Sequence, residues 1–472
     1  MFAKIQKKNE INFVSLHKRI LMLLNKSYYK TNFALALPII LSSIGQSFTQ
    51  MVDTIMVGRL GATELAGVAF AGSVSMNVLV FGMGIAMALT PLTGQGYARK
   101  EHRKISMLFQ NSLALNAIIG LIIIGILFLI FPFLGYFGQP QEVIDICKPY
   151  YIIISISFLP SLIFLTFKQF LEGIGNTKNA MIITITANVI NIILNYLLIY
   201  GKLGFPALGI IGAGIATLIA KTIMPIIFLI FILNHKTFKK YFLFFSWSRF
   251  SFNTQKIILR LGMPISGQMF LEFSSLLFIT IMMGWVSKYA LAGYHVVITI
   301  VGTTFLIATG LSNATTVLIS HAYGKKDYIE IWKNFKAGYH LTLITMGFFA
   351  IILFVFGGEI AKIFSPDEKV VEIAKVLFIV AGFFQLIDGS QVLFLGALRG
   401  INDVAKPMKY AFISYILIAL PFAYICGFVF DIGFWSIFAG FSVGLSIAAI
   451  LYFRRFRLKI NSFKKEIETI KE

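Results

Sequence analysis

Three carboxylates lie inside long apolar stretches of the sequence: Asp53, Glu272 and Asp388. An ionisable side chain at the centre of a membrane helix costs roughly 2.5–3.5 kcal/mol on insertion scales, so each such residue is a candidate for function. Two carboxylates that share a partly desolvated pocket cannot both stay ionised without a counter-cation. We therefore predict that these acids bind H⁺ or Na⁺ as a coupling ion, with Na⁺ held at Glu272 and Asp388 if sodium is used, and with no other metal or cofactor.

Amides and hydroxyls accompany each acid at helical spacing. The companions are Ser42, Gln46 and Gln50 for Asp53, Gln268 and Ser275 for Glu272, and Gln385 and Gln391 for Asp388. Residues three or four apart share one face of a helix, and a polar stripe within a bilayer must face protein or a watery cavity. The alternative for each acid is a structural role, hydrogen-bonded between helices.

A second polar stripe carries no charge and consists of Thr184, Asn188, Asn191 and Asn195. Side-chain amides can line a substrate cavity, but they also join helices within membranes, and the spacing favours neither. We predict a cavity lined by Gln46, Gln50, Asn188, Asn191, Gln268 and Gln385. Lys221 is the one base predicted inside an apolar stretch, and the sequence does not identify its partner.

The elements that carry these residues are membrane helices. Of 472 residues, 58% are hydrophobic and 13% are charged, whereas a soluble domain is about 25% charged. A bilayer core needs about 20 apolar residues per helix. The chain divides at charges and turn signals into twelve spans, at approximately residues 33–57, 66–91, 106–132, 149–170, 179–200, 206–233, 259–283, 291–319, 337–357, 373–397, 409–430 and 432–453. This composition excludes a nucleic-acid-binding protein despite the formal net charge of +21.

The basic residues give the expected orientation. Most of the 41 Lys and Arg fall in the two terminal segments and in alternate loops between the spans. The positive-inside rule then places both termini in the cytoplasm, and we expect a multi-pass protein of the bacterial plasma (inner) membrane. The N-terminal segment 1–32 is either a basic amphipathic helix on the membrane surface or a disordered tail.

The sequence contains an internal repeat. An offset of 226 in the numbering aligns residues 54–58 with 280–284 and residues 65–67 with 291–293. Each copy holds six spans, so both copies enter the membrane in the same sense, related by a pseudo-twofold along the membrane normal. Two lobes across a cleft are the geometry of an alternating-access transporter, although duplicated bundles also occur in membrane enzymes and assembly factors. The predicted regions are a basic N-terminal segment (1–32), an N-lobe (33–233), a cytoplasmic linker (234–258), a C-lobe (259–453) and a basic tail (454–472).

The acids do not follow the repeat. At the same offset, Asp53 corresponds to Ile279 and Glu272 corresponds to Gln46. Each lobe is therefore expected to have its own chemistry, with Asp53 in the first and the Glu272/Asp388 pair in the second.

Three stretches around the acids resemble the multidrug and toxic compound extrusion (MATE) family, and the likeness covers essentially the whole chain. They are Leu37-Pro38 with Gln50-Met51-Val52-Asp53-Thr54-Ile55-Met56-Val57-Gly58 and Leu65-Ala66; Arg260-Leu261-Gly262-Met263-Pro264 with Glu272; and Asp388-Gly389 with Gly396-Ala397-Leu398-Arg399-Gly400 and Asp403. The acids match the NorM-type branch. The resemblance implies an antiporter that expels cationic, amphipathic compounds as Na⁺ or H⁺ enters, with Asp53, Glu272 and Asp388 as coupling residues. The expected partners are such small molecules and the lipid bilayer, without nucleic acid, and the expected state is a monomer.

Other function classes fit less well. An ATP-driven pump would need a G-x-x-x-x-G-K-[ST] motif, which is missing, and a channel would not need unlike acid sites on opposing lobes. A lipid-linked saccharide flippase of the same superfamily shape would favour a cavity rich in Arg and Lys, whereas the charges found inside the spans are three acids and one base. An intramembrane enzyme is the third alternative, without H-E-x-x-H or G-x-S-x-G to support it.

Overall fold

The computed structural model describes residues 24–243 and 245–471. Within them every regular element is helical, and twelve segments are long and apolar enough to cross a membrane, which confirms the predicted spans. The spans are α2 (Lys26–Gly58), α3 (Ala62–Met87) with α4 (Leu89–Ala98), α5 (His102–Ile130) with η1 (Phe131–Phe137), α6 (Gln141–Gly173), α7 (Thr177–Tyr200), α8 (Gly209–Asn234), α10 (Phe252–Val286), α11 (Lys288–Gly324), α12 (Tyr328–Phe364), α13 (Glu368–Gly400), α14 (Ala405–Ala411) with η3 (Phe412–Ala419), α15 (Leu420–Tyr424) and η4 (Ile425–Val429), and α16 (Phe434–Lys471). The short elements α9 (Lys236–Leu243) and η2 (Trp247–Arg249) lie between α8 and α10.

The two ends of the predicted chain differ in what can be said of them. The predicted basic N-terminal segment lies outside the described residues as far as residue 23, and its last residues form the first turns of α2. At the other end, α16 continues helical through the predicted basic tail to Lys471.

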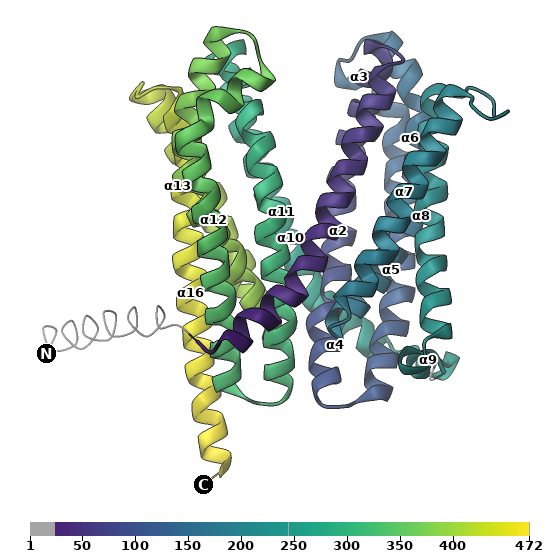
Figure 1. Ribbon diagram of the computed structural model, residues 1–472, viewed down its shortest axis with the longest axis vertical. Helices are drawn as coiled ribbons and strands as arrows, with labels where there is room; N and C mark the ends of the chain where they lie inside the picture. Colours follow the sequence, from purple (N-terminus) through teal and green to yellow (C-terminus); the bar gives the residue numbers. More distant parts are fainter. Residues whose placement is uncertain (1–23, 244, 472) are drawn as a thin grey trace, which may run out of the picture.

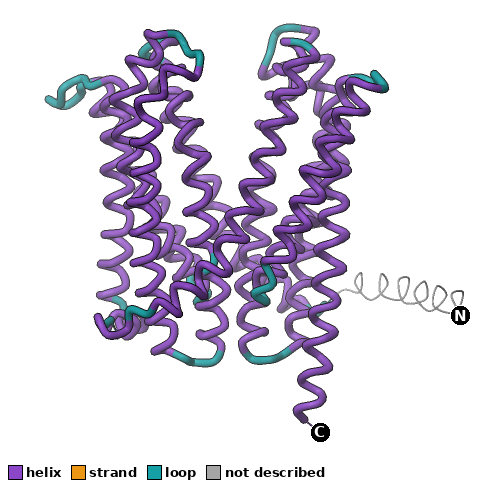
Figure 2. The backbone as a smooth tube through the Cα atoms, turned by 180° about the vertical axis from the view of Figure 1, so that it is seen from behind, coloured by secondary structure: helices purple, strands orange, loops and turns teal. Residues whose placement is uncertain are grey.

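The helices form two groups that meet at one end and diverge at the other (Figure 1). We call α3 to α8 the N-half and α11 to α16 the C-half. The same separation is visible from behind, with loops at both ends of the helices (Figure 2). The end where the halves meet also carries the described ends of the chain, and we call it the basic end because it holds the basic loops 99–104, 236–260, 325–336 and 399–409.

Aromatic side chains fill the interior of each half. In the N-half, Phe109 of α5 stacks on Phe170 of α6 with ring centroids 4.2 Å apart. In the C-half, Phe384 of α13 lies 5.3 Å from Phe438 of α16, and both are buried. Burial of these rings gives each half its own packed core.

Helices α2 and α10 cross between the halves. The first part of α2 packs against α11 and α12, where Thr315 donates a hydrogen bond to Asn32 (3.3 Å), and its second part packs against α7. The first part of α10 packs against α3, where Ser266 donates to the carbonyl of Phe81 (2.6 Å). These crossings correspond under the repeat, because Ile40 of α2 aligns with Ser266 of α10 at the offset of 226.

A glycine lies at each crossing. A Cβ on Gly84 of α3 would overlap the backbone nitrogen of Ser266, and one on Gly310 of α11 would overlap the Ile40 side chain. Gly84 and Gly310 are themselves equivalent positions of the repeat. Because small residues let membrane helices approach closely, both crossings depend on them.

The substitution Gly84→Ala is expected to destabilise the protein, because the added methyl group would meet the α10 backbone and overpacking costs about 1–3 kcal/mol. The thermal midpoint of the purified protein should fall. Gly125→Ala is the matched control, since a Cβ on Gly125 meets nothing within 4 Å and Ala favours a helix over Gly. Equal midpoints for Gly84→Ala and the unmodified protein would contradict the close crossing.

Two equivalent hydrogen bonds close the basic end. Nε2 of His321 on α11 donates to the carbonyl of Gly173 on α6 (2.8 Å), and Nε2 of Gln95 on α4 donates to the carbonyl of Gly400 on α13 (3.2 Å). The two donors are equivalent at the offset of 226, and the two acceptors at an offset of 227. The structure therefore confirms the parallel repeat in its contacts as well as in its helix order.

Candidate ion and substrate cavities

Each half contains one cavity that holds predicted acids. The N-half cavity has a volume of about 330 Å³ and lies between α2, α3, α6, α7 and α8. The C-half cavity has a volume of about 240 Å³ and lies between α10, α11, α13 and α16, with Met87 of α3 at its border. The predicted separation of the acids between two sites agrees with this arrangement.

In the N-half cavity the two predicted polar stripes face each other. Asn195 of α7 donates a hydrogen bond from Nδ2 to Oδ1 of Asp53 on α2 (2.5 Å), and Tyr200 donates to the carbonyl of Met56 (2.9 Å), which fixes the register of the two helices. Gln46, Gln50, Asn188 and Asn191 all line this cavity, as predicted from their spacing.

Lys221 of α8 lines the same cavity as Asp53. Its Nζ lies 5.9 Å from the ring centroid of Phe164, and its charge acts on that of Asp53. The residue that the sequence left without a partner therefore faces Asp53 across a shared cavity.

The C-half cavity brings Glu272 of α10 and Asp388 of α13 together, with Asp388 only 3% exposed. Gln268 donates from Nε2 to Oε2 of Glu272 (2.6 Å), and its Oε1 accepts a hydrogen bond from Nη2 of Arg399 (2.7 Å). Gln268 thus links an acid to a base. The rest of the lining is largely apolar and includes Met269, Phe273, Phe305, Phe384 and Phe441.

The glutamines predicted beside Asp388 do something else. Gln385 is fully buried and donates to Oγ1 of Thr304 on α11 (2.6 Å), and Gln391 donates to the hydroxyl of Tyr415 on η3 (2.7 Å). Neither is among the residues that line the C-half cavity. These two amides join α13 to its neighbours, as membrane amides often do.

Three charged residues inside the spans escaped the sequence analysis: Lys168, Glu172 and Arg399. The helices α6 and α13 continue to Gly173 and Gly400, past the charges at which the sequence was divided. The stated ratio of three acids to one base inside the spans is therefore wrong. One signal was available, because Glu172 and Arg399 occupy equivalent places in the repeat at the offset of 227.

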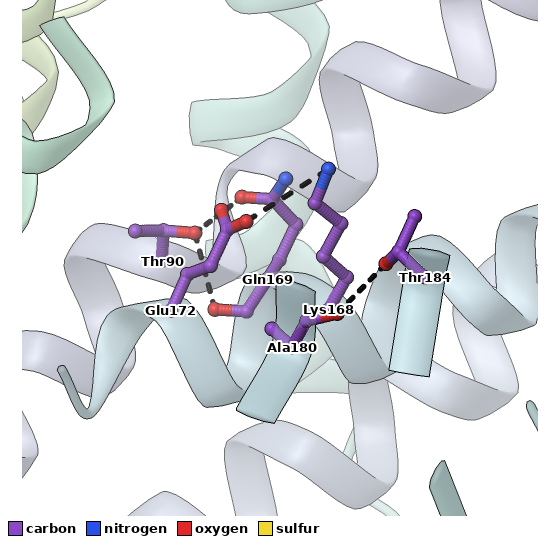
Figure 3. A network of polar contacts seen from close by, with 6 residues as sticks. All are labelled: Thr90, Lys168, Gln169, Glu172, Ala180 and Thr184. Carbon is purple, nitrogen blue, oxygen red and sulfur yellow. Dashed lines mark hydrogen bonds and ion pairs between the residues drawn. The ribbon is translucent and has the colours of Figure 1, made fainter. Parts of the chain in front are cut away.

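Lys168 and Glu172 form a buried pair on α6. Nζ of Lys168 lies 3.9 Å from Oε1 of Glu172 (Figure 3). Thr90 of α4 donates hydrogen bonds to the side chain of the intervening Gln169 and to its carbonyl, the latter at 3.2 Å. This network lies next to Gly173, which accepts the hydrogen bond from His321, so it supports the closed basic end.

The acids do not form a ready-made metal centre. Over residues 24–243 and 245–471, no three His, Cys, Asp or Glu side chains gather in a group that could hold a metal ion. What the C-half cavity offers a cation is two carboxylates, with the oxygens of Thr309, Ser312 and Asn313 in the same lining.

Comparisons with known proteins agree with this architecture. The sequence matches the MatE family over residues 38–197 and 264–425. It is 30% identical over 424 residues to the multidrug resistance protein NorM of Vibrio vulnificus (strain YJ016), covering 88% of this chain and 92% of that protein. It is also 30% identical over 451 residues to the probable multidrug resistance protein NorM of Agrobacterium fabrum (strain C58 / ATCC 33970), covering 94% and 96%.

Solved structures share the fold. A crystal structure described as MATE in the bent conformation superposes with a TM-score of 0.84 at 20% identity, over 93% of this chain and 97% of that one. A eukaryotic MATE transporter superposes with the same TM-score at 18% identity, over 93% and 99%. Given two matched family regions, one in each repeat, and relatives that align over most of its length, the chain belongs to the MATE family of membrane transporters and is not an enzyme.

Proposed function

We propose that this protein is a multidrug efflux transporter that exports cationic or amphipathic compounds in exchange for Na⁺ or H⁺. The observation that carries the proposal is the C-half cavity, where Glu272 and Asp388 face an apolar, aromatic lining. An apolar lining with few polar groups suits drug-sized ligands, and aromatic rings and methionine adapt to varied shapes. The relatives named for multidrug resistance support the same function.

Exchange follows from competition for these carboxylates. Two acids and one base line the C-half cavity, so its charged side chains carry one net negative charge. Either a cationic compound or the coupling ion can neutralise that charge. Coupling can be no stronger than the difference in affinity of the two ligands for the two states of the protein.

The proposed cycle alternates the access of both cavities. In this structure the halves meet at the basic end, where His321 and Gln95 hold the two equivalent carbonyls. Rocking of the halves would break these hydrogen bonds and open that end. We place the basic end and both termini in the cytoplasm, and the protein in the inner membrane, because basic loops stay on the cytoplasmic side. One chain forms both cavities, so the proposed transport unit is a monomer.

A lipid-linked saccharide flippase is the second candidate. Lys168, Lys221 and Arg399 inside the spans favour it more than the sequence analysis allowed, because bases bind the phosphates of such lipids. Only Lys221 and Arg399 line a cavity, however, and each shares it with at least one acid.

Purified protein in liposomes tests the proposal directly. A Na⁺ gradient and a pH gradient are imposed separately, and transport of tetramethylrhodamine methyl ester, a fluorescent monocation, is followed. One of the gradients is expected to drive dye transport, and collapse of that gradient with an ionophore should stop it. Dye transport under neither gradient would contradict coupled efflux and favour the flippase.

A further inference from the structure

The N-half cavity differs from the C-half cavity in its charge. The charged side chains that line it are Asp53 and Lys221, one acid and one base, so they carry no net charge. A monocation placed there gains from Asp53 what it loses to Lys221, since charge interactions scale with charge and inverse distance for both. A small-molecule cation therefore has less reason to bind in this cavity than in the C-half cavity.

The acid and the base remain apart. Among the described residues, the ion pairs within 4.0 Å do not include Lys221 or Asp53. Asp53 accepts its hydrogen bond from Asn195 at Oδ1, and no described residue donates to Oδ2. The two charges thus face one cavity with capacity left on both: three N–H donors on Lys221 and a carboxylate oxygen on Asp53.

Asn188 supplies an independent indication of a ligand. Its side chain is only 7% exposed and lines the N-half cavity, yet Nδ2 has no hydrogen-bond partner in the part of the chain that the structure describes. A buried donor without an acceptor costs about 1–3 kcal/mol, so such donors usually belong to sites that bind something. The missing group is an acceptor, as a ligand carboxylate would be.

We propose that the N-half cavity binds zwitterions, with Lys221 and Asn188 holding the ligand's carboxylate and Asp53 holding its ammonium group. This inference rests on the proposed efflux function and adds a substrate class that the C-half cavity does not select. The two cavities then divide the substrates: cations without an acidic group bind in the C-half, and compounds with both charges bind in the N-half. Lys221 is the specificity-determining residue of this division.

The experiment compares two ligands that differ in one group. Tetramethylrhodamine free acid carries both charges, and tetramethylrhodamine methyl ester keeps only the cationic one. Fluorescence anisotropy measures equilibrium binding of each dye to the purified full chain in detergent. The same dyes are then used for transport in liposomes, so that failure of efflux and failure of the inference are separate results.

Lys221→Met should reverse the preference. Without the lysine, affinity for the free acid is expected to fall about tenfold or more, because a charge-assisted hydrogen bond is lost. Affinity for the methyl ester should stay equal or rise, because Asp53 is no longer opposed by a base. Lys221→Arg should keep a preference for the free acid, and Asn188→Ala should weaken the free acid alone. Lys202→Met is the control, an exposed lysine outside the cavities that should change neither affinity.

Three outcomes would overturn the inference. A Lys221→Met protein that loses both dyes equally would show a structural role for the lysine, and size-exclusion chromatography establishes whether that protein is folded. An unchanged affinity for the free acid would show that Lys221 does not contact its carboxylate. Equal binding of the two dyes by the unmodified protein would show no selection for zwitterions. If methyl ester transport persists in any of these cases, the proposed efflux function stands without the inference.

Discussion

Replacing Asp388 with asparagine is expected to abolish coupled efflux while leaving the protein folded and inserted. Asparagine has nearly the same shape, but it can neither carry the negative charge nor take up a proton. Asp388 is 3% exposed and faces the C-half cavity together with Glu272, so little water is at hand to replace its charge. The loss of a hydrogen bond to a charged group costs about 1.5–3 kcal/mol, which corresponds to about a ten- to hundredfold weaker interaction.

Efflux of a monocationic dye from liposomes under the driving gradient measures this effect. Asp145→Asn serves as the control, because Asp145 is an exposed acid at the opposite end of the helices from the basic loops. Membrane yield and the thermal midpoint show whether each variant is folded. Wild-type efflux by Asp388→Asn would remove Asp388 from the proposed mechanism and leave it a structural residue of α13.

The substitution Arg399→Gln is expected to trap the coupling ion. Arg399 is the base in the C-half cavity, linked through Gln268 to Glu272. Without it, two carboxylates share the cavity with no fixed positive charge, so a proton or Na⁺ must compensate them. The coupling ion should bind about tenfold more tightly, in line with a change of about 1.4 kcal/mol. Turnover should fall because release of that ion becomes slow.

The signature of this effect is a split between affinity and rate. The concentration of coupling ion that gives half-maximal transport should decrease while the maximal rate also decreases. Arg399→Lys should restore part of the rate, since it returns the charge without the forked geometry. Arg103→Gln, at an exposed arginine of the basic end, should change neither quantity. A decrease in rate with a higher half-maximal concentration would argue against an internal counter-cation.

The sequence predicts the fold well because membrane insertion leaves few alternatives. Backbone polar groups in lipid must be satisfied within the segment, so a long apolar stretch becomes a helix. The repeat is equally readable, since Gly84 and Gly310, or Gln95 and His321, keep equivalent contacts in the two copies. The stripe from Gln46 to Asp53 also faces its cavity as the helical spacing predicts.

Tertiary packing explains what spacing could not show. Lys168 and Arg399 look like loop residues because they follow the apolar cores of α6 and α13, yet both helices continue and neighbouring elements cover them. The spacing that places Gln385 beside Asp388 is the same whether the amide faces a cavity or Thr304. Nor does any local pattern show that the first part of α2 leaves its own half, because that depends on residues far along the chain.

The crossing of α2 has a consequence for biogenesis. Asn32 meets Thr315, 283 residues later in the chain, and at about 5–20 residues per second a ribosome needs roughly 15 to 60 s to synthesise that length. Throughout that interval the first turns of the first membrane helix wait beside lipid or translocon without their final neighbours. Insertion of the early spans and completion of the tertiary structure are therefore separate events in time. The nascent chain is most exposed to quality-control proteases until α11 arrives.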